Sequence, residues 1–356
     1  MDLRMMRMER NVLLEDMENC LNSEVNWNEF RYAKFLITGA TGLIGSLMVK
    51  MLLYANEKLA LHMKIYAFIR DEGKAKKIYK EQSGRINYII GDLSDLQFNL
   101  EEGFDYIIHA AAITMSWVMI EKPVDVIETA LNSTRLLLTY LQKHIECKMV
   151  YISSMEMYGT VDNEKMVDET CLGYIDLHSV RSCYPESKRM CECMCNSFVS
   201  QYGVKVCSAR LAQTFGSGVL PGENRVFAQF ARSVINHNDI VLHTDGLSEG
   251  NYVYTLDAVK AILLLLLQGK SGEAYNIANE ASHVTIKEMA ELVARQIAQG
   301  QIKVVYDIPV SQNKYGYAPK VKLNLSSDKI RALGWLPNVG LVDAYNRMIM
   351  YMCDNA

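Results

Sequence analysis

A tyrosine and a lysine four residues apart carry the strongest chemical signal in this sequence. They stand in the run Tyr184-Pro185-Glu186-Ser187-Lys188, where the proline suits the first turn of a helix. Side chains at this spacing lie on one face of a helix, so both can face the same cleft. A nearby ammonium lowers the pKa of a tyrosine from about 10. We therefore predict that Tyr184 is a general acid/base activated by Lys188, although an exposed helix pair without chemistry has the same spacing.

Two serines and a glutamate lie upstream of this pair. Ser153 and Ser154 follow the apolar run 149–152, which predicts a buried strand. A hydroxyl at the end of that strand can hydrogen-bond the same substrate oxygen as Tyr184. Glu156 follows two residues later and is a candidate second acid/base. Strand ends often carry ordinary serines, so the prediction depends on these residues meeting Tyr184 in space.

Three glycines spaced three residues apart indicate a dinucleotide site. Gly39, Gly42 and Gly45 lie between an apolar run at 34–37 and a helical pattern that begins near residue 43. A strand, a tight turn and a helix in this order aim free backbone N–H groups at a negative charge, such as the pyrophosphate of a dinucleotide. The spacing differs from the general G-x-G-x-x-G fingerprint, and an ordinary loop is the alternative.

Strand-like and helical patterns alternate through the first two thirds of the chain. The predicted strands are 34–37, 64–70, 85–92, 104–109, 149–154 and 204–210, and the clearest helical patterns are 126–143 and 185–202. This alternation predicts an α/β fold with a doubly wound, Rossmann-like parallel sheet. Ligands of such sheets bind at the carboxyl ends of the strands, where the glycine turn and both serines fall.

The pattern changes after Gly216, where Gly- and Asn-rich loops separate shorter elements. We interpret 33–216 as the dinucleotide-binding domain and 217–356 as mainly a smaller C-terminal α/β substrate lobe, interleaved with the first domain. Residues 1–32 form an N-terminal extension, in which Val12, Leu13, Met17 and Leu21 predict a short amphipathic helix. The sequence leaves open whether that helix packs on the body or on a partner subunit.

The composition excludes several partner classes. The formal net charge of -4 is small and mixed in sign, which gives no reason to expect nucleic acid or an anionic membrane as partner. Nine scattered cysteines, and an N-terminus without a continuous apolar core, favour a reducing cytoplasm. Cys191, Cys193 and Cys195 form C-x-C-x-C, but positions two apart on a helix point to different sides, so we predict no metal site.

The ordered set of motifs resembles the extended short-chain dehydrogenases/reductases. More narrowly, it resembles the NAD-dependent epimerase/dehydratase group that acts on nucleotide sugars. The resemblance spans about residues 33 to 350. Its motifs are 38–45, Gly91-Asp92-Leu93, His109-Ala110-Ala111-Ala112, Ser153-Ser154, Tyr158-Gly159, Tyr184-x-x-x-Lys188, Arg210-Leu211 to Phe215-Gly216, Tyr275-Asn276-Ile277-Ala278 and Leu333-Gly334-Trp335.

The resemblance implies a role for each motif residue. Tyr184 would take the proton of a sugar hydroxyl, usually at C4, as hydride leaves for a retained NAD. Lys188 would lower the pKa of Tyr184 and hold the nicotinamide ribose, and Ser154 would orient the oxygen. The implied cofactor-binding residues are Gly39, Thr41, Gly42, Leu43, Ile44, Gly45, Arg70, Asp92, Leu93, Ala110, Ala111, Ala112, Ser153, Tyr184 and Lys188. The implied substrate-binding residues, for a nucleoside-diphosphate sugar, are Thr114, Gln213 and Arg225.

Four departures from the family pattern bear on the reaction. Dehydratases and decarboxylases often carry Asp or Ser before the glutamate, whereas this chain has Met155, which has no proton for a departing hydroxyl. Related decarboxylases place an arginine where this chain has Gly250, which weakens recognition of a uronic acid. The usual asparagines are replaced by Gln213 and by Ala130.

Several functions therefore stay open. We expect a nucleotide-sugar epimerase/dehydratase that works through transient oxidation at C4 and forms a homodimer through 126–143 and 185–202. Arg70 stands where NAD-users commonly carry an acid, so NADP is possible and an NADPH-dependent keto-sugar or carbonyl reductase is the main alternative. A UDP-glucuronate decarboxylase and a non-catalytic cofactor-binding regulator are further alternatives.

Overall fold

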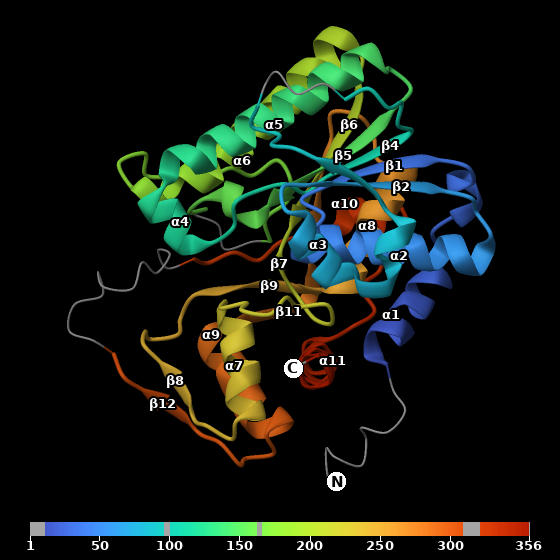
Figure 1. Ribbon diagram of the computed structural model, residues 1–356. Helices are drawn as coiled ribbons and strands as arrows, with labels where there is room; N and C mark the ends of the chain where they lie inside the picture. Colours follow the sequence, from blue (N-terminus) through green and yellow to red (C-terminus); the bar gives the residue numbers. More distant parts are fainter. Residues whose placement is uncertain (1–10, 96–99, 162–165, 309–320, 356) are drawn as a thin grey trace.

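Seven parallel strands form the main sheet of this computed structural model, which describes residues 11–95, 100–161, 166–308 and 321–355 (Figure 1). Their order is β10-β6-β5-β4-β1-β2-β3, and every neighbouring pair runs parallel. The strands are β1 (Lys34–Thr38), β2 (Lys64–Ile69), β3 (Asn87–Ile90), β4 (Tyr106–His109), β5 (Lys148–Ser154), β6 (Lys205–Leu211) and β10 (Ala274–Ile277). The predicted doubly wound, Rossmann-like fold is confirmed.

Alternating side chains along the strands build a separate core on each face of the sheet. In β1, Phe35 and Ile37 face the core beneath α2 (Leu43–Leu59) and α8 (Thr255–Gln268), whereas Leu36 faces the opposite core. That opposite core lies beneath α5 (Pro123–Lys143) and α6 (Cys183–Tyr202). Figure 1 shows α5 and α6 side by side over one face, with α2, α3 (Glu72–Tyr79) and α8 on the other. The switch point of the sheet, between β1 and β4, is where such folds bind ligands.

Short helical segments fill several connections of the main sheet. These are η2 (Trp27–Phe30), η3 (Lys80–Arg85), α4 (Ser116–Glu121), η4 (Met155–Tyr158) and η5 (Val180–Ser182). Three of them matter for the site: α4 follows β4, η4 follows β5, and η5 leads directly into α6.

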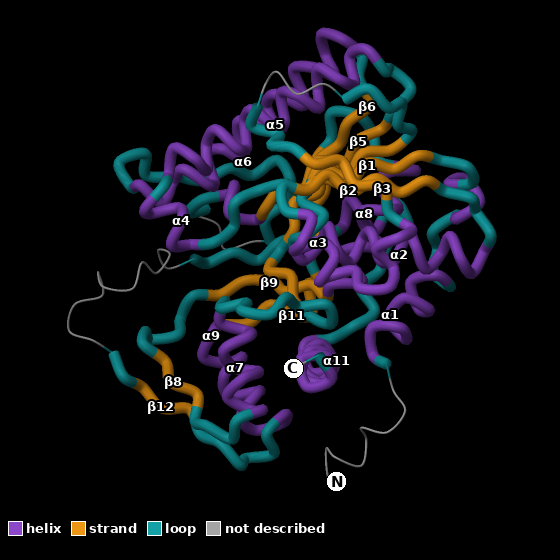
Figure 2. Tube along the Cα trace, viewed as in Figure 1, coloured by secondary structure: helices purple, strands orange, loops and turns teal. Residues whose placement is uncertain are grey.

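Two small sheets with their helices form a second lobe, at the lower left in Figure 2. In the first sheet β9 (Glu249–Tyr254) lies between β7 (Gln213–Phe215) and β11 (Asn279–Thr285), and in the second β8 (Ile240–Leu242) pairs with β12 (Val304–Tyr306). The accompanying helical segments are α7 (Val226–Ile235), α9 (Ile286–Leu292), the π-helical η6 (Val293–Ile297) and α11 (Leu341–Asp354), whereas the short α10 (Asp328–Arg331) packs against β10 of the main sheet.

Two elements from beyond residue 217 belong to the main sheet rather than to this lobe. The β10 strand pairs with β6 as the seventh strand, and α8 packs beneath β5 and β6. Residues 261–266 of the long aliphatic run in α8 are thereby buried against the sheet. In the second half of the chain, elements of the main sheet (α8 and β10) therefore alternate with segments of the second lobe.

The N-terminal helix α1 (Val12–Leu21) packs on the body of its own chain, against α2, α8 and α11. Its Asp16 is buried, and the carboxylate accepts hydrogen bonds from Ser217 Oγ and Tyr254 Oη, each at 2.5 Å. Arg347 Nη1 on α11 lies 2.8 Å from the same carboxylate. Burial nevertheless raises the pKa of Asp16, so this helix is fixed by a charge that depends on its partners.

Across the described ranges, we find no helix that is both long enough and apolar enough to cross a membrane.

Candidate active site

The glycine turn leaves no room for side chains. Gly39 has a φ of 62°, and a Cβ atom there would lie 2.5 Å from the carbonyl oxygen of Ala110. A Cβ atom on Gly45 would lie 2.2 Å from the carbonyl oxygen of Gly39. The first turn of α2 carries no acidic residue, and its N-cap, Gly42, has no side chain to cap it. The start of α2 thus suits the pyrophosphate of a dinucleotide, and the residues present fit NAD.

A buried hydrogen-bond network joins this turn to the end of β4. Thr38 Oγ1 lies 2.8 Å from His109 Nδ1 and accepts a hydrogen bond from the Ala111 N–H at 3.2 Å. His109 Nε2 lies 3.1 Å from Thr134 Oγ1 on α5. Burial lowers the pKa of His109 to about 3, so the imidazole stays neutral near neutral pH. The network places the half-buried residues 110–112 beside the glycine turn.

The ends of β2 and β3 bring a cation and an anion together. Arg70 and Asp92 are both exposed there. Hydrogen bonds from Ser94 lower the pKa of Asp92, and the Arg70 charge adds to that effect. The first acid after β2, Asp71, is used as the N-cap of α3, where it accepts from the Lys74 N–H at 2.9 Å. The predicted binding residues of the turn itself, Thr41, Leu43 and Ile44, are half-buried, and Leu93 is buried.

Tyr184 and Lys188 lie in the first two turns of α6, where both side chains are buried. An apolar cluster from α4 and α5, Val118, Met119 and Val126, packs against Tyr184. Lys188 Nζ donates to the carbonyl oxygen of Ile152 at 2.7 Å and lies 5.8 Å from the centre of the Tyr184 ring. The lysine therefore reaches the end of β5 while its ammonium stays close to the Tyr184 ring.

A buried ion pair fixes the helix that carries this pair. Glu192, one turn beyond Lys188, accepts three hydrogen bonds from the Arg210 guanidinium of β6, the shortest at 2.7 Å. Arg210 Nη1 also donates to Tyr158 Oη at 2.8 Å. Charge-assisted bonds of this kind are directional. The pair between Glu192 and Arg210 therefore fixes which face of α6 meets the sheet.

The pKa values of the pair run opposite to the expectation for Tyr184. Burial raises the pKa of Tyr184 to about 12 and lowers that of Lys188 to about 8. The prediction that the tyrosine is already acidified within the protein is wrong, because burial disfavours the phenolate more strongly than the nearby cations favour it. The Tyr184 phenol must therefore be activated by charges that bound ligands bring into the site.

The two serines at the end of β5 have different surroundings. Ser153 is buried and its Oγ has no hydrogen-bond partner among the described residues. A buried hydroxyl in that state is costly, which suits a contact with a bound cofactor. Ser154 hydrogen-bonds the Tyr184 phenol, which lowers the pKa of that phenol, and its Oγ accepts from the Glu156 N–H at 3.3 Å.

Glu156 is held by an arginine that the sequence analysis missed. Arg181 Nη2 in η5 lies 2.8 Å from Glu156 Oε2. The Arg181 guanidinium carbon lies 5.8 Å from the centre of the Tyr184 ring. Arg181 stands three residues before Tyr184, a spacing that carries no signal before the path of η5 is known.

The second lobe contributes one charge to the site. The Arg225 guanidinium lowers the pKa of Tyr184 from the N-cap of α7, and it pairs with Glu223 at 2.6 Å. Gln213 is half-buried in β7, and Thr114 is exposed in the loop between β4 and α4. Arg225 is thus brought to Tyr184, whereas Gln213 and Thr114 remain predicted contacts.

Two of the departures from the family pattern meet in space. A Cβ atom added to Gly250 would lie 3.7 Å from the Met155 Cε atom. Met155 is buried beside the serines and Glu156. Met155, which has no acidic proton, and Gly250, which stands where decarboxylases carry an arginine, therefore form one apolar, uncharged surface.

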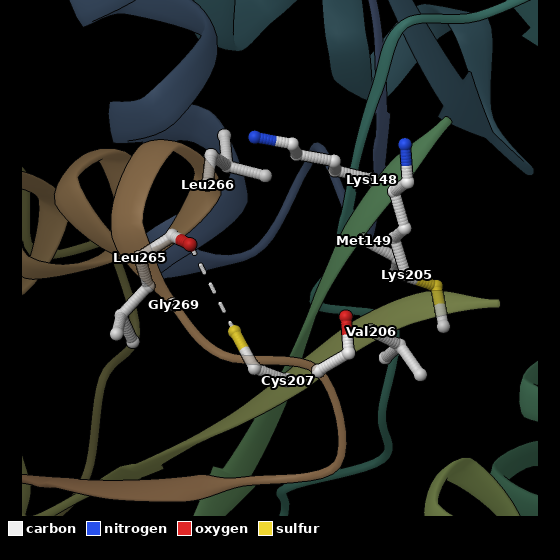
Figure 3. A pocket seen from close by; sticks show the side chains of 9 residues that line it. Lys148, Met149, Lys205, Val206, Cys207, Leu265, Leu266 and Gly269 are labelled. Carbon is white, nitrogen blue, oxygen red and sulfur yellow. Dashed lines mark hydrogen bonds between the residues drawn. The ribbon is translucent and has the colours of Figure 1, made fainter. Parts of the chain in front are cut away.

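Other features lie away from this site. Figure 3 shows a small hollow lined by Lys148, Lys205 and Cys207, in which Cys207 Sγ donates to the Leu265 carbonyl oxygen at 3.9 Å. It lies where β5 and β6 begin, at the sheet edge opposite the glycine turn. Cys191 and Cys195 are buried on one side of α6 whereas Cys193 is exposed, so positions two apart point to different sides as predicted.

Comparison with known proteins agrees with this geometry. A model described as the NAD dependent epimerase/dehydratase family matches residues 35–278. The chain is 28% identical over 337 residues to the dTDP-D-glucose 4,6-dehydratase of Homo sapiens, covering 90% of each chain. It is 25% identical over 318 residues to UDP-glucuronic acid decarboxylase 1 of Danio rerio, covering 89% of this chain and 72% of the relative.

A solved structure shares the fold. This is a dTDP-glucose 4,6-dehydratase from Streptomyces venezuelae with NAD and TYD bound, which superposes with a TM-score of 0.74 at 22% identity and covers 90% of this chain and 97% of its own. Fold, glycine turn and the Tyr184–Lys188 pair together define an extended short-chain dehydrogenase/reductase. The chain belongs to the NAD-dependent epimerase/dehydratase family of nucleotide-sugar enzymes, and its cofactor is NAD.

Proposed function

We propose that this enzyme oxidises the C4 hydroxyl of a nucleoside-diphosphate sugar to a transient ketone and then reduces it again. The observation that carries the proposal is the convergence of Ser154, Tyr184 and Lys188 at the carboxyl end of the sheet, the end that also carries the glycine turn. The end of β5 supplies the serine, α6 supplies the pair, and the Lys188 ammonium bonds the Ile152 carbonyl between them. Bound NAD supplies the hydride acceptor and donor.

The side chains divide the proton work. Ser154 and Tyr184 hydrogen-bond the C4 oxygen, and Tyr184 takes its proton as the C4 hydrogen leaves. Lys188, whose pKa burial lowers to about 8, holds its ammonium near the phenol and stabilises the phenolate. In the return step Tyr184 gives the proton back to the oxygen, so the residues end each cycle unchanged.

We propose epimerisation as the outcome of the cycle. If the ketone turns within the site before it is reduced, the C4 hydroxyl re-forms with inverted configuration and needs no further acid or base. Met155 offers no proton to a departing hydroxyl, and Gly250 offers no cation to a sugar carboxylate. This apolar surface supports a neutral sugar, and it argues against decarboxylation.

Dehydration is the second candidate, and Glu156 is the observation that favours it. Its carboxylate follows the serines, where it could abstract a proton beside the ketone, and the human relative described above is a 4,6-dehydratase. Loss of water would then need a proton from a source other than Met155. Arg225, Gln213 and Thr114 are proposed contacts for the nucleotide sugar in either case.

We further propose a cytoplasmic homodimer. All nine cysteines are thiols, which supports a reducing compartment. The outer faces of α5 and α6 expose Val124, Ile127 and Met190, apolar side chains that a second copy would cover.

The purified protein tests the function directly. Denaturation should release NAD, and fresh enzyme should convert one member of a panel of UDP- and dTDP-sugars without net reduction of added NAD. A C4 epimer identified by NMR supports epimerisation, and a 4-keto-6-deoxy product supports dehydration instead. Protein that releases no NAD and consumes NADPH would contradict both and favour a reductase.

Tyr184→Phe checks the mechanism. Because the phenol is the only group proposed to move the C4 proton, the variant should lose turnover by about 1000-fold while it still binds NAD. Full turnover in that variant would exclude the proposed role of Tyr184.

A further inference from the structure

The ion pair between Glu156 and Arg181 lies against the tyrosine that the proposed mechanism uses. Arg181 Nη2 and Glu156 Oε2 are 2.8 Å apart, and the side chains are 15% and 31% exposed. Both charges therefore act through partly desolvated surroundings, where electrostatic effects are stronger than in water. The Arg181 guanidinium carbon is 5.8 Å from the Tyr184 ring centre, the same distance as the Lys188 ammonium.

The backbone on both sides of this pair is fixed. Arg189 on α6 donates to the carbonyl oxygens of Met157, Tyr158 and Gly173, at 2.6, 3.1 and 2.7 Å. These bonds tie η4, which carries Glu156, to the helix that carries Tyr184. Arg189 thus fixes the backbone directly after Glu156, and Arg181 holds the Glu156 carboxylate.

The two charges act on the phenol in opposite directions. Glu156 raises the pKa of Tyr184 and Arg181 lowers it, while Arg225 lowers it from the second lobe. Among the described residues, the other titratable groups near the phenol are Lys188 and Cys183 on its own helix and Tyr151 on β5, whereas the contacts from α4 and α5 are apolar. Without Arg181, the Glu156 carboxylate would oppose phenolate formation.

Arg181 also has an unused donor. Its Nε–H is buried and has no acceptor among the described residues. A buried donor without an acceptor is unfavourable, and an oxygen atom of a bound sugar would satisfy it.

We propose that Arg181 is a positioning residue of the acid/base site, which holds the Glu156 carboxylate beside Tyr184 and balances its charge. Glu156 is then a charge held in place rather than a free base. This inference rests on the proposed role of Tyr184 and does not depend on which sugar is bound, but it agrees with epimerisation rather than with a dehydration that uses Glu156 as base.

A titration without substrate tests the inference. Protein labelled with 3-fluorotyrosine, whose phenol is more acidic than that of tyrosine, is titrated by 19F NMR with NAD bound. Tyr184 is the resonance that disappears in Tyr184→Phe. We expect Arg181→Gln to move the midpoint of that resonance upward by about one pH unit and Glu156→Gln to move it downward by a similar amount. Arg181→Lys, which keeps the charge, should stay within a few tenths of the unsubstituted protein.

Opposite shifts from the two members of one ion pair are the deciding result, because general loosening of the site would move both variants in the same direction. Shifts in the same direction, or no shift in either variant, would overturn the inference. Arg331→Gln is the matched control, since it breaks an Arg–Glu pair at 3.4 Å with Glu280 outside the candidate site. Melting curves establish that each variant is folded.

The kinetics separate this inference from the proposed function. With an active sugar nucleotide, the limb of the kcat–pH profile that rises toward alkaline pH should follow the NMR midpoints. Loss of the Nε–H in Arg181→Lys should raise KM by about tenfold. If the midpoints shift as expected but no sugar nucleotide is converted, the proposed function fails and the role of Arg181 stands. If turnover occurs and the midpoints do not move, the reverse holds.

Discussion

Lys188 is charged where the surroundings favour a neutral amine, and that conflict has a measurable consequence. Burial lowers its pKa to about 8 from 10.5, so below pH 8 the folded protein keeps the ammonium at a cost of about 3 kcal/mol. Its hydrogen bond to Ile152 returns about 1 kcal/mol of this. Lys188→Met should therefore abolish turnover yet raise the free energy of unfolding by about 2 kcal/mol at pH 7.

The pH dependence identifies the cause of this gain. Above pH 8 the folded lysine is already neutral, and above 10.5 the unfolded one is too, so the gain should shrink as pH rises through this window. Urea unfolding of both proteins at pH 7 and pH 10 measures it. An equal gain at both values would mean that better packing, not charge removal, stabilises the variant.

His109 makes the fold sensitive to mild acid. Its pKa falls to about 3 from 6.5 because it is buried. Between these pH values the imidazole is protonated in the unfolded chain but neutral in the folded protein. Stability from this residue is complete above pH 6.5 and declines as pH falls, by about 1.4 kcal/mol per pH unit. His109→Gln should give a shallower loss of stability in urea between pH 6.5 and 4.5, whereas the exposed His178→Gln should keep the original slope.

At this scale the residue types were predictable and their electrostatics were not. Spacing and strand ends made Tyr184, Lys188 and Ser154 candidates, and the family resemblance gave each of them its predicted role. The raised pKa of Tyr184 and the role of Arg181 depend on burial and on the path of η5, which no pattern in the run 179–184 records.

The glycine turn acts as one unit with the end of β4. Gly39→Ala would place a Cβ atom 2.5 Å from the Ala110 carbonyl oxygen, at a φ of 62°. The turn must then shift, with a cost of about 2 kcal/mol or more, and the N–H groups at the start of α2 no longer point at the pyrophosphate. We expect at least a tenfold weaker affinity for NAD, measured by calorimetry.

A second glycine provides the control for that substitution. Nothing lies within 4 Å of the Cβ position of Gly84, so Gly84→Ala should keep the affinity for NAD. If both variants bind NAD equally, the turn is not the pyrophosphate site.

Strands and helices of the first half were predictable because strand, turn and helix alternate there with clear apolar runs. The same signals in Ala274–Ile277 and Thr255–Gln268 did not reveal that these elements belong to the main sheet. Pairing of β10 with β6 is a contact between distant segments, and a short apolar run does not specify its neighbour.

At the scale of the whole molecule, the outer faces of α5 and α6 are the surface that we propose pairs with a second copy. Ile127 and Met190 on α5 and α6 are 38% and 51% exposed, so glutamates at both positions would place charges in the proposed interface. Light scattering should give a dimer for the original chain and a monomer for Ile127→Glu/Met190→Glu. Val241→Glu, at a position 44% exposed on β8, should leave the dimer intact; a dimer that survives the double substitution would place the interface elsewhere.

The order of synthesis gives α1 an unusual dependence. Asp16 leaves the ribosome early, but the arginine that neutralises it lies 331 residues later, and Ser217 and Tyr254 also follow long after. Until α11 has been made, burying the Asp16 carboxylate is unfavourable, so α1 cannot yet dock stably on the incomplete fold. Docking of α1 is therefore expected to be among the last folding events, and it reports that α11 has reached its place.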